Sequence, residues 1–556
     1  MLDISKKLVT EDYFVDWIKN NDGILVTRKE LNVNNKNLSQ CRPYTMVGLT
    51  GYPQIVEQFF SQIIQNFSNK IILVTLETDF FPMKDEYLNH PLLHHWFTWN
   101  KQYEHPKLTC IPIGLNLDRH LKPMLEFLYN TKKKERTKLF AVNLSVSSNP
   151  ERIELLNTAK TKWKNFCTFI ENIPFAKTYF KYSNTEGQIK IDETDPKCYD
   201  ILSEYKYILS PPGAGIDCHR TWEALYCGTI PIIIESSINE MYKDLPVLIV
   251  NSWDEITKEL LEKKYEEIQL KLKNNEYNMN KLYFEYWRNL INEKNVLKIE
   301  ELSIRDDMYD IHFITYGNYR FKDSKKRLLK EAEEFGAFKS VTGYGPENLP
   351  VDFFKQFKDI LIQPRGGGYW IWRPIILLEK LNKMKEGEYL IYLDAGCHLN
   401  KYGKKRFFEY IEMLNNSEYG IMSFQMSGKL GPGNLEKENK WTNSEIFKYL
   451  DVDVNGEHGN SGQYLGGILV MKKNEHLLKI IKLLIKALND DPLMYTDNYN
   501  TNQHPQFQEN RHEQSLFSLL RKIHGSVVLD GDESFMIPFN SEESMKYPFW
   551  AARIKG

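Results

Sequence analysis

The clearest change from apolar to polar positions lies between residues 205 and 234. An apolar run at 207–209 leads into a glycine-containing loop at 210–215, and an amphipathic stretch at 217–227 follows. After Gly228 comes a β-branched run at 230–234. This order predicts a strand, a glycine loop, a helix and a second strand. Such a unit aims backbone N–H groups and the positive end of a helix at its ligand, which suits a diphosphate.

Similar alternation extends over the rest of the first half. Apolar runs at 24–27, 44–49, 71–75 and 108–113, with a helical pattern at 54–67, predict an open α/β domain over residues 1–135. Residues 136–300 predict a second α/β domain, whose further elements are a strand at 139–145, a helix at 149–164, a strand at 247–250 and a charged helical region at 253–293. The basic run at 132–138 is interpreted as a solvated connection between the two.

A polar stretch between Lys294 and Met308 predicts a connection to a third domain, over residues 308–556. Its pattern begins with a strand at 311–317 and an amphipathic helix at 322–335. It continues with a helix near 351–357, a glycine loop that opens an aromatic-rich helix at 365–381, and a strand at 388–396.

Composition narrows the class of protein. The chain has 556 residues, of which 42% are hydrophobic, so we expect several packed domains rather than disorder. A net charge of −2 excludes general attraction to nucleic acid or to anionic membranes. Seven scattered cysteines without a CxxC pair fit a reducing compartment and argue against a zinc module. Without a long apolar segment, we expect a soluble, cytoplasmic chain with no membrane span.

The predicted helix at 217–227 carries three polar residues near one face: His219, Arg220 and Glu223. The Arg220 guanidinium is suited to fork onto phosphate oxygens, and Glu223 is suited to accept hydrogen bonds from ribose hydroxyls. The alternative is a surface ion pair between Arg220 and Glu223, with Asp217 as a plain helix cap.

The sequence motif of residues 213–232, GxGxDCHRxWEALYxGxIPI, resembles the donor-binding segment of exostosin-like glycosyltransferases with the GT-B fold. The resemblance implies a nucleotide-sugar donor and no metal in this module. It also implies that residues 1–135 form the acceptor side and supply a general base. Its implied donor-binding residues are Gly213, Gly215, Asp217, His219 and Glu223, with Arg220 as a catalytic group.

Candidates for the base are Glu77 and Asp79, which follow the predicted strand at 71–75, and the histidines His94 and His95. The alternative is that these acids and histidines are merely solvated.

A second site is indicated by Asp394, at the end of the strand predicted at 388–396. Sheets of α/β proteins place ligands at such strand ends, and divalent ions that bridge a diphosphate need hard oxygen ligands. Asp394-Ala395-Gly396 occupies the place of the DxD motif of GT-A glycosyltransferases, with Gly396 instead of the second acid. The alternative is an ordinary turn aspartate.

Four segments in order resemble GT-A-like polysaccharide glycosyltransferases: residues 366–381, 389–400, 463–473 and 511–522. The resemblance implies that Asp394 and His512 bind a divalent metal, Mn²⁺ or Mg²⁺, and that Glu513 is a catalytic carboxylate. It implies acceptor contacts at Gly466 and Gly467, and donor contacts at Arg365, Tyr369 and Arg373. The alternative for His512 and Glu513 is helix capping.

These observations predict an α/β protein: a GT-B-like pair of Rossmann-like domains followed by a GT-A-like domain. The predicted function is that of a bifunctional glycosyltransferase, with nucleotide-sugar donors and a glycan or glycoconjugate acceptor. The alternative is a nucleotide-sugar or carbohydrate-binding scaffold with one inactive module. A Rossmann oxidoreductase is disfavoured, because PPGAGID lacks the GxGxxG spacing.

Overall fold

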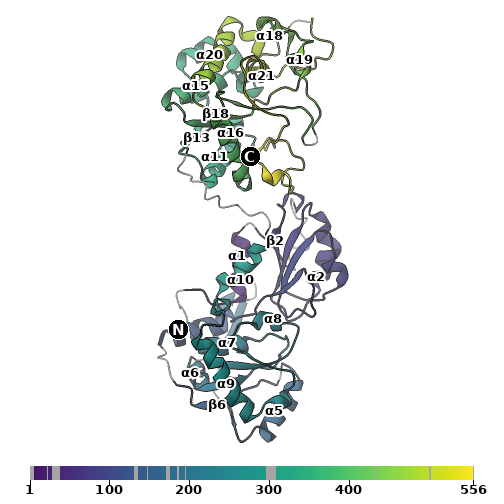
Figure 1. Cartoon of the computed structure of the whole chain (residues 1–556), viewed down its shortest axis with the longest axis vertical. Coiled ribbons are helices and arrows are strands. Elements are labelled where there is room, and N and C mark those ends of the chain that lie inside the picture. Colours follow the sequence, from purple (N-terminus) through teal and green to yellow (C-terminus); the bar gives the residue numbers. More distant parts are fainter. Residues whose placement is uncertain are drawn as a thin grey trace. The chain divides into compact units, whose positions relative to one another are not determined.

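The structure is a computed structural model, and it divides into two compact units, Met1–Val296 and Leu297–Gly556, called unit 1 and unit 2 below (Figure 1). The residues it describes are 6–21, 23–27, 38–130, 135–146, 148–170, 176–183, 187–194, 196–295, 309–430, 433–499 and 502–554. Most of the predicted connections at 132–138 and 294–308 lie outside the described residues.

The first sheet of unit 1 has five parallel strands in chain order: β1 (Ile24–Val26), β2 (Thr45–Thr50), β3 (Ile71–Leu76), β4 (Leu93–Thr98) and β5 (Leu108–Cys110). The helices of this part are α1 (Glu11–Asn20), α2 (Ile55–Gln58), α3 (Asp85–Leu88) and α4 (Lys122–Asn130). The helical pattern at 54–67 forms α2 and then continues as π-helical and 3-10 turns. Neither α1 nor β4 was expected from the pattern.

The second sheet of unit 1 is also parallel and has the order β12-β11-β10-β6-β7. Its strands are β6 (Lys138–Val142), β7 (Cys167–Phe169), β10 (Tyr205–Leu209), β11 (Ile230–Ile234) and β12 (Leu248–Val250). Its helices are α5 (Glu151–Thr161), α6 (Lys197–Leu202), α7 (His219–Cys227), α8 (Asn239–Tyr242), α9 (Lys258–Lys273) and α10 (Phe284–Glu293). Because β6 leads to β7 on one side and the later strands add on the other, the strand order reverses between β6 and β10.

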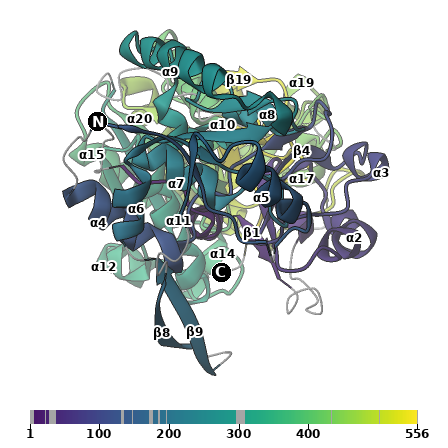
Figure 2. The ribbon, with the colours of Figure 1, turned by 90° about the horizontal axis from the view of Figure 1, so that it is seen from below.

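An unpredicted antiparallel hairpin, β8 (Ala176–Ser183) and β9 (Gly187–Thr194), extends from this unit and is seen at the bottom of Figure 2. The charged region at 253–293 is not one helix, because the chain leaves α-helical geometry between α9 and α10. α10 then packs on α1, where the Phe284 ring meets Tyr13, Phe14 and Trp17 edge-on. This contact closes the second half of unit 1 onto its first half.

A buried aspartate joins the two sheets of unit 1. Asp217 is 2% exposed, and its carboxylate accepts hydrogen bonds from the Tyr242 hydroxyl (2.5 Å), the Trp222 indole (3.0 Å) and the backbone N–H of Ile113 (2.8 Å). Its own N–H donates to Asn100 Oδ1 at 2.6 Å. Ile113 and Asn100 belong to the first half of the unit, so one carboxylate fixes the loops of both sheets.

Unit 2 is built on a four-stranded sheet of order β14-β13-β15-β18, with β18 antiparallel: β13 (Ile311–Tyr316), β14 (Ser340–Tyr344), β15 (Tyr389–Leu393) and β18 (Ile468–Lys472). Two-stranded pairs join β16 (His398–Leu399) to β20 (Phe549–Trp550), and β17 (Met422–Phe424) to β19 (Val527–Leu529). Here the strand order reverses between β13 and β15.

The main helices of unit 2 are α11 (Lys322–Phe335), α15 (Arg373–Lys383), α16 (Lys404–Asn415), α20 (Glu475–Asp490) and α21 (Glu513–His524). Shorter ones are α12 (Val351–Gln356), α13 (Lys358–Leu361), α14 (Gly366–Tyr369), α17 (Glu438–Trp441), α18 (Ser444–Tyr449) and α19 (Glu457–Asn460). The pattern predicted α11 with the observed bounds. The helix predicted at 365–381 instead begins at Arg373, because the residues from Gly366 to Trp370 have positive φ.

Alternate residues of β15 enter two different cores, which explains its unbroken apolar run. Leu390 and Tyr392 pack with α15, α20 and α21, whereas Tyr389, Ile391 and Leu393 pack with α11 and α16. Figure 1 shows these helices on opposite sides of the sheet. A strand covered on both faces has no solvent side and so needs no polar positions. The protein is thus a mixed α/β structure with several parallel sheets.

Among the residues that the structure describes, no helix combines the length and the apolar character that crossing a membrane requires.

We expect Asp217→Ala to lower the free energy of unfolding of unit 1 by about 3 kcal/mol or more, because it strands three buried donors at roughly 1–3 kcal/mol each. Urea denaturation measures this. The control is Asp254→Ala, which removes an exposed partner of Lys162 and is expected to cost less than about 1 kcal/mol. Equal stability of the two variants would contradict the role of Asp217.

Candidate functional site

The glycine loop of unit 1 lies at the reversal of strand order between β6 and β10. Arg152 of α5 ties the loops that follow these strands, donating to the carbonyls of Pro211 (2.7 Å) and Pro212 (2.8 Å) after β10, and to that of Ser145 (3.1 Å) after β6. The Gly213 N–H donates to the Gly215 carbonyl at 2.9 Å and tightens the turn. A crevice at the carboxyl ends of strands beside such a reversal is where open α/β sheets bind ligands.

Gly215 brings the two halves of unit 1 together. A Cβ at this position would lie 2.4 Å from Asn100 Nδ2 and 3.2 Å from Asp79 Oδ1, so a side chain is excluded. The Asp79 carboxylate therefore lies beside the predicted donor loop. Glu77 is on the same loop after β3, and both acids are exposed. The structure thus brings Asp79 to the glycine loop, with Glu77 two residues before it in the chain.

The polar face of α7 is largely engaged by the protein. Glu223 is 5% exposed and accepts hydrogen bonds from Tyr199 Oη and Arg220 Nε, both at 3.0 Å. His219 Nδ1 pairs with the Gly114 carbonyl at 2.8 Å. The pair of Arg220 and Glu223 is therefore present, but it is partly buried rather than a surface ion pair, with 26% of the Arg220 side chain exposed.

Glu11 is an acid of this site that the pattern did not single out. It lies in the first turn of α1, and burial together with the nearby charges of Asp12, Glu77 and Asp79 raises its pKa to about 7. The one available signal was the N-cap Thr10 followed by two acids, which is common to many surface helices.

The two histidines lie within β4 rather than in a loop. His95 is 4% exposed, pairs with the Thr109 hydroxyl at 2.8 Å, and has its pKa lowered to about 3 by burial. His94 packs edge-on against the Tyr44 ring. These contacts are those of sheet residues, and of the predicted base candidates Asp79 is the one that lies beside the glycine loop.

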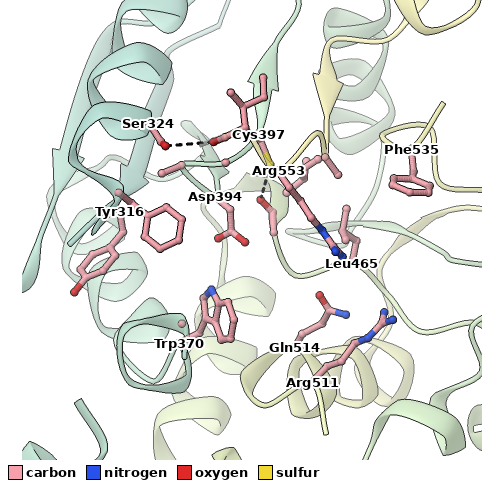
Figure 3. A pocket seen from close by; sticks show the side chains of 18 of the residues that line it. Tyr316, Ser324, Trp370, Asp394, Cys397, Leu465, Arg511, Gln514, Phe535 and Arg553 are labelled. Atoms are coloured by element: carbon pink, nitrogen blue, oxygen red, sulfur yellow. Dashed lines mark hydrogen bonds between the residues drawn. The ribbon is translucent and has the colours of Figure 1, made fainter. Parts of the chain in front are cut away.

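Unit 2 holds a pocket of about 930 Å³ at the carboxyl ends of β13 and β15. Tyr316, Gly317 and Asn318 line it after β13, and Asp394 to Cys397 line it after β15. Trp370 and Phe535 add aromatic walls, and Figure 3 shows their rings on opposite sides of the cavity. The pocket therefore lies at the reversal of strand order, as the glycine loop does in unit 1.

Asp394 points into this pocket (Figure 3). Its Oδ1 accepts hydrogen bonds from Arg373 Nη2 (3.0 Å) and Tyr392 Oη (2.5 Å), and a third of the side chain is exposed. A Cβ at Gly467 would lie 2.8 Å from Asp394 Oδ2, so the glycine keeps space beside that oxygen. The structure thus brings together Asp394 and Gly467, two residues that the sequence singled out.

Glu513, in contrast, does not line the pocket. It has no exposed surface, its Oε2 pairs with Arg373 Nη1, and burial raises its pKa. Its neighbour Gln514 lines the pocket and accepts from the N–H of Gly466 at 2.8 Å. Consecutive helix residues point in directions about 100° apart, so only one of the two faces the cavity.

The other predicted residues form a separate cluster. His512 is 1% exposed, pairs with Asp497 at 2.9 Å and stacks on the Tyr369 ring with centroids 4.8 Å apart. Arg365 donates to Glu509 at 2.9 Å. Within the described ranges, no three His, Cys, Asp or Glu side chains are placed to share a metal ion.

Further polar residues line the pocket without having been expected. They are Arg320, Asp323, Glu436, Arg511, Asp532 and Arg553. Arg511 was inside a quoted segment, but nothing in its spacing marked it; Arg553 lies far along the chain from Asp394.

No family model and no curated protein matches the sequence. Among solved structures, similarity is found to a glycosyltransferase involved in the glycosylation of the major capsid of PBCV-1, with 12% identity, 43% of this chain and 93% of that chain covered, and a TM-score of 0.26. The GtfA/B complex matches with 13% identity, 46% and 58% coverage, and a TM-score of 0.25.

The pneumococcal O-GlcNAc transferase GtfA in complex with UDP and GlcNAc matches with 11% identity, 46% and 58% coverage, and a TM-score of 0.22. This chain therefore spans little more than half the length of the GtfA and GtfA/B chains. At such TM-scores the likeness carries no conclusion about function, which has to come from the geometry above.

Proposed function

We propose that this protein is a glycosyltransferase with two transfer sites, one in each unit, acting on nucleotide-sugar donors and on a glycan or glycoconjugate acceptor. One observation carries the proposal. In each unit, glycines and charged residues gather at the carboxyl ends of two parallel strands between which the strand order reverses, β6/β10 in unit 1 and β13/β15 in unit 2. A nucleotide diphosphate is the ligand class best suited to such an edge.

In unit 1 the donor diphosphate would lie over Gly213 and Gly215, before the N-terminus of α7. Arg220 would offset the charge that grows on the leaving diphosphate, and Glu223 would hold its guanidinium by the bond at Nε. Asp217 and His219 would position the loop through their contacts with the first half of the unit. This assigns residues 136–300 to the donor and residues 1–135 to the acceptor, as in a GT-B arrangement.

The acceptor hydroxyl of unit 1 needs a base on the side of the first sheet. Asp79 lies beside the glycine loop, Glu77 follows the same strand, and Glu11 feels the charges of both. Glu11 fits best, because a base works most effectively when its pKa lies near the working pH. Its proton acceptance from the acceptor hydroxyl would accompany attack of that oxygen on the anomeric carbon.

In unit 2, a GT-A-like domain in this proposal, Asp394 would face the donor and Gly467, which lines the pocket, would leave room for the acceptor. Gly466 does not line the pocket and would act by holding Gln514 through its N–H. A divalent ion, Mn²⁺ or Mg²⁺, would add positive charge at the leaving diphosphate. The residues fit an ion held by one protein oxygen, Asp394 Oδ2, with donor phosphates and water as its other ligands. His512 does not line this pocket and pairs with Asp497 instead, so the proposal does not use it as a ligand.

One observation supports the alternative, a binding scaffold with one inactive module. Arg373 forms ion pairs with both Asp394 and Glu513 and so neutralises the two acids predicted to be catalytic in unit 2. Incubation of the full chain with a panel of nucleotide-sugars and glycan acceptors separates the two. A nucleotide-sugar that binds to one unit without being transferred by it would favour the scaffold.

We expect Asp394→Asn to lower sugar transfer by unit 2 about a hundredfold, roughly 3 kcal/mol, because the amide keeps the shape but loses the charge. EDTA should stop transfer by unit 2 and leave transfer by unit 1 unchanged. Asp323→Asn, an exposed acid of the same pocket, is the control and should change the rate only a few-fold. Transfer by unit 2 that survives both Asp394→Asn and EDTA would contradict this role.

For unit 1 we expect kcat/KM, measured in EDTA, to rise with pH through about 7. Below that pH Glu11 holds a proton and is inactive as a base; above it the carboxylate is free. Glu11→Gln should remove the rise and slow transfer on the order of a hundredfold. Asp16→Asn, on an exposed position of the same helix, should keep the wild-type profile. An unchanged pH profile in Glu11→Gln would exclude Glu11 as the base.

A further inference from the structure

Within the part of the chain that the structure describes, three arginines line the pocket of unit 2 without a partner acid: Arg320, Arg511 and Arg553. Within the described residues, neither Arg511 nor Arg553 forms an ion pair within 4.0 Å. Arg373, by comparison, pairs with Asp394 and Glu513. The nearest candidate counter-charge for Arg511 is Glu436, and that carboxylate already accepts from Lys440 (2.9 Å) and the Trp441 indole (2.5 Å). The charges of Arg511 and Arg553, like that of Arg320, are therefore not neutralised directly by a carboxylate of the described residues.

Arg511 is fixed in place although it has no acid partner. Its guanidinium carbon lies 4.0 Å from the Trp441 ring centroid, and its Nη1 donates to Met426 Sδ at 3.4 Å. Its backbone N–H donates to Ser515 Oγ at 3.1 Å. Burial lowers the pKa of Arg511, and the neighbouring charge of Arg553 lowers it further, against the opposite effect of acids such as Glu436. Two like charges held near each other are a cost that the folded protein bears until an anion binds.

Arg553 is delivered by the chain segment 551–554, which crosses the loop after β15. The Ile554 N–H donates to the Gly396 carbonyl at 2.8 Å, and Ser324 Oγ donates to the Ile554 carbonyl at 3.2 Å. A Cβ at Gly396 would lie 3.4 Å from Arg553 Cα. Gly396, two residues after Asp394, thus leaves space for this segment to pack against it. The segment brings the positive charge of Arg553 to the site, where a second acidic residue would bring a negative charge. Figure 3 shows the Arg553 side chain extending past Asp394 toward Gln514 and Arg511.

We propose that Arg511 and Arg553 bind the diphosphate of the nucleotide-sugar in unit 2, which rests on the proposed function of this pocket. Guanidinium groups present paired N–H donors that match phosphate oxygens, and the two arginine charges balance a diphosphate. The cavity of about 930 Å³ is large enough for a nucleotide-sugar. Part of the donor's charge is then neutralised by the protein itself, so diphosphate binding persists when metal is removed.

The test is a binding titration of the full-length chain in EDTA. All variants carry Arg220→Ala, which weakens diphosphate binding by unit 1, so that the measured binding comes mainly from unit 2. The probes are nucleoside diphosphates of the five common bases, the corresponding nucleosides, and inorganic diphosphate. We expect the bound nucleoside diphosphate to lose tenfold or more in affinity in Arg553→Gln and in Arg511→Gln, while nucleoside affinity stays the same. Arg553→Lys and Arg511→Lys should retain most of the affinity.

Arg320→Gln is the matched control, because Arg320 lines the same pocket but donates to the Tyr319 hydroxyl at 2.9 Å. It should change diphosphate affinity less than threefold. Thermal unfolding of each variant separates lost binding from lost folding, and Arg553, which is exposed, tests the inference even if Arg511→Gln does not fold.

The outcomes separate the inference from the proposed function. Nucleoside diphosphate binding that is unchanged in both glutamine variants overturns the inference and leaves the proposed function standing. Loss of inorganic diphosphate binding in these variants supports the anion site whether or not a nucleoside adds affinity. If the background chain binds neither nucleotide nor inorganic diphosphate in EDTA, the inference is overturned; absence of nucleotide binding with Mg²⁺ or Mn²⁺ added overturns the function as well.

Discussion

Burial of parallel strands on both faces is the constraint on which both units depend. Once β15 sends Leu390 and Tyr392 into one core and Ile391 and Leu393 into the other, neither face of the sheet is open to a ligand. Polar ligand-binding residues are then confined to the edge of the sheet where the strands end. A crevice forms there where the chain connections from two neighbouring strands lead to opposite sides of the sheet. The glycine loop of unit 1 and the pocket of unit 2 both lie at such a reversal.

The two sites solve the same electrostatic problem with different residues. In unit 1, the glycine loop lies beside Asp79 of the first half, so the proposed donor and acceptor roles would be divided between two sheets that Asp217 holds together. In unit 2, the acid and the cations lie within one pocket, where Asp394 is held by Arg373 and faces Arg511 and Arg553. A single carboxylate with nearby arginines provides weaker metal binding and stronger direct anion binding than a pair of carboxylates does.

Local sequence pattern predicted the features that depend on local structure. The strand, loop and helix around Gly213, the apolar run of β15 and the bounds of α11 all follow from periodicity and glycine placement. Asp394 and Gly467 were brought together because both lie at ends of neighbouring strands, which a pattern of strands can indicate. The assignments of their chemical roles remain predictions.

Features that depend on helix phase or on distant chain segments were not predictable. Which of Glu513 and Gln514 faces the pocket is decided by where α21 begins, and a shift of one residue exchanges them. Glu223 is buried because Tyr199, on a different helix, covers it. Arg553 reaches the site through a segment that contacts Gly396 in the fold but lies far from it in the sequence. The pattern of a short stretch of sequence cannot predict such contacts between distant segments.

The central claim is that each unit transfers its own sugar, and linkage analysis of the products tests it most directly. The full-length chain, Arg220→Ala and Asp394→Asn would be incubated with the same donors and acceptor, and the glycosidic linkages formed would be identified by mass spectrometry and NMR. The account predicts two linkages from the wild type, with one lost in Arg220→Ala and the other lost in Asp394→Asn. A single linkage in the wild type, or both linkages lost with one substitution when the acceptor for each step is supplied, would contradict it.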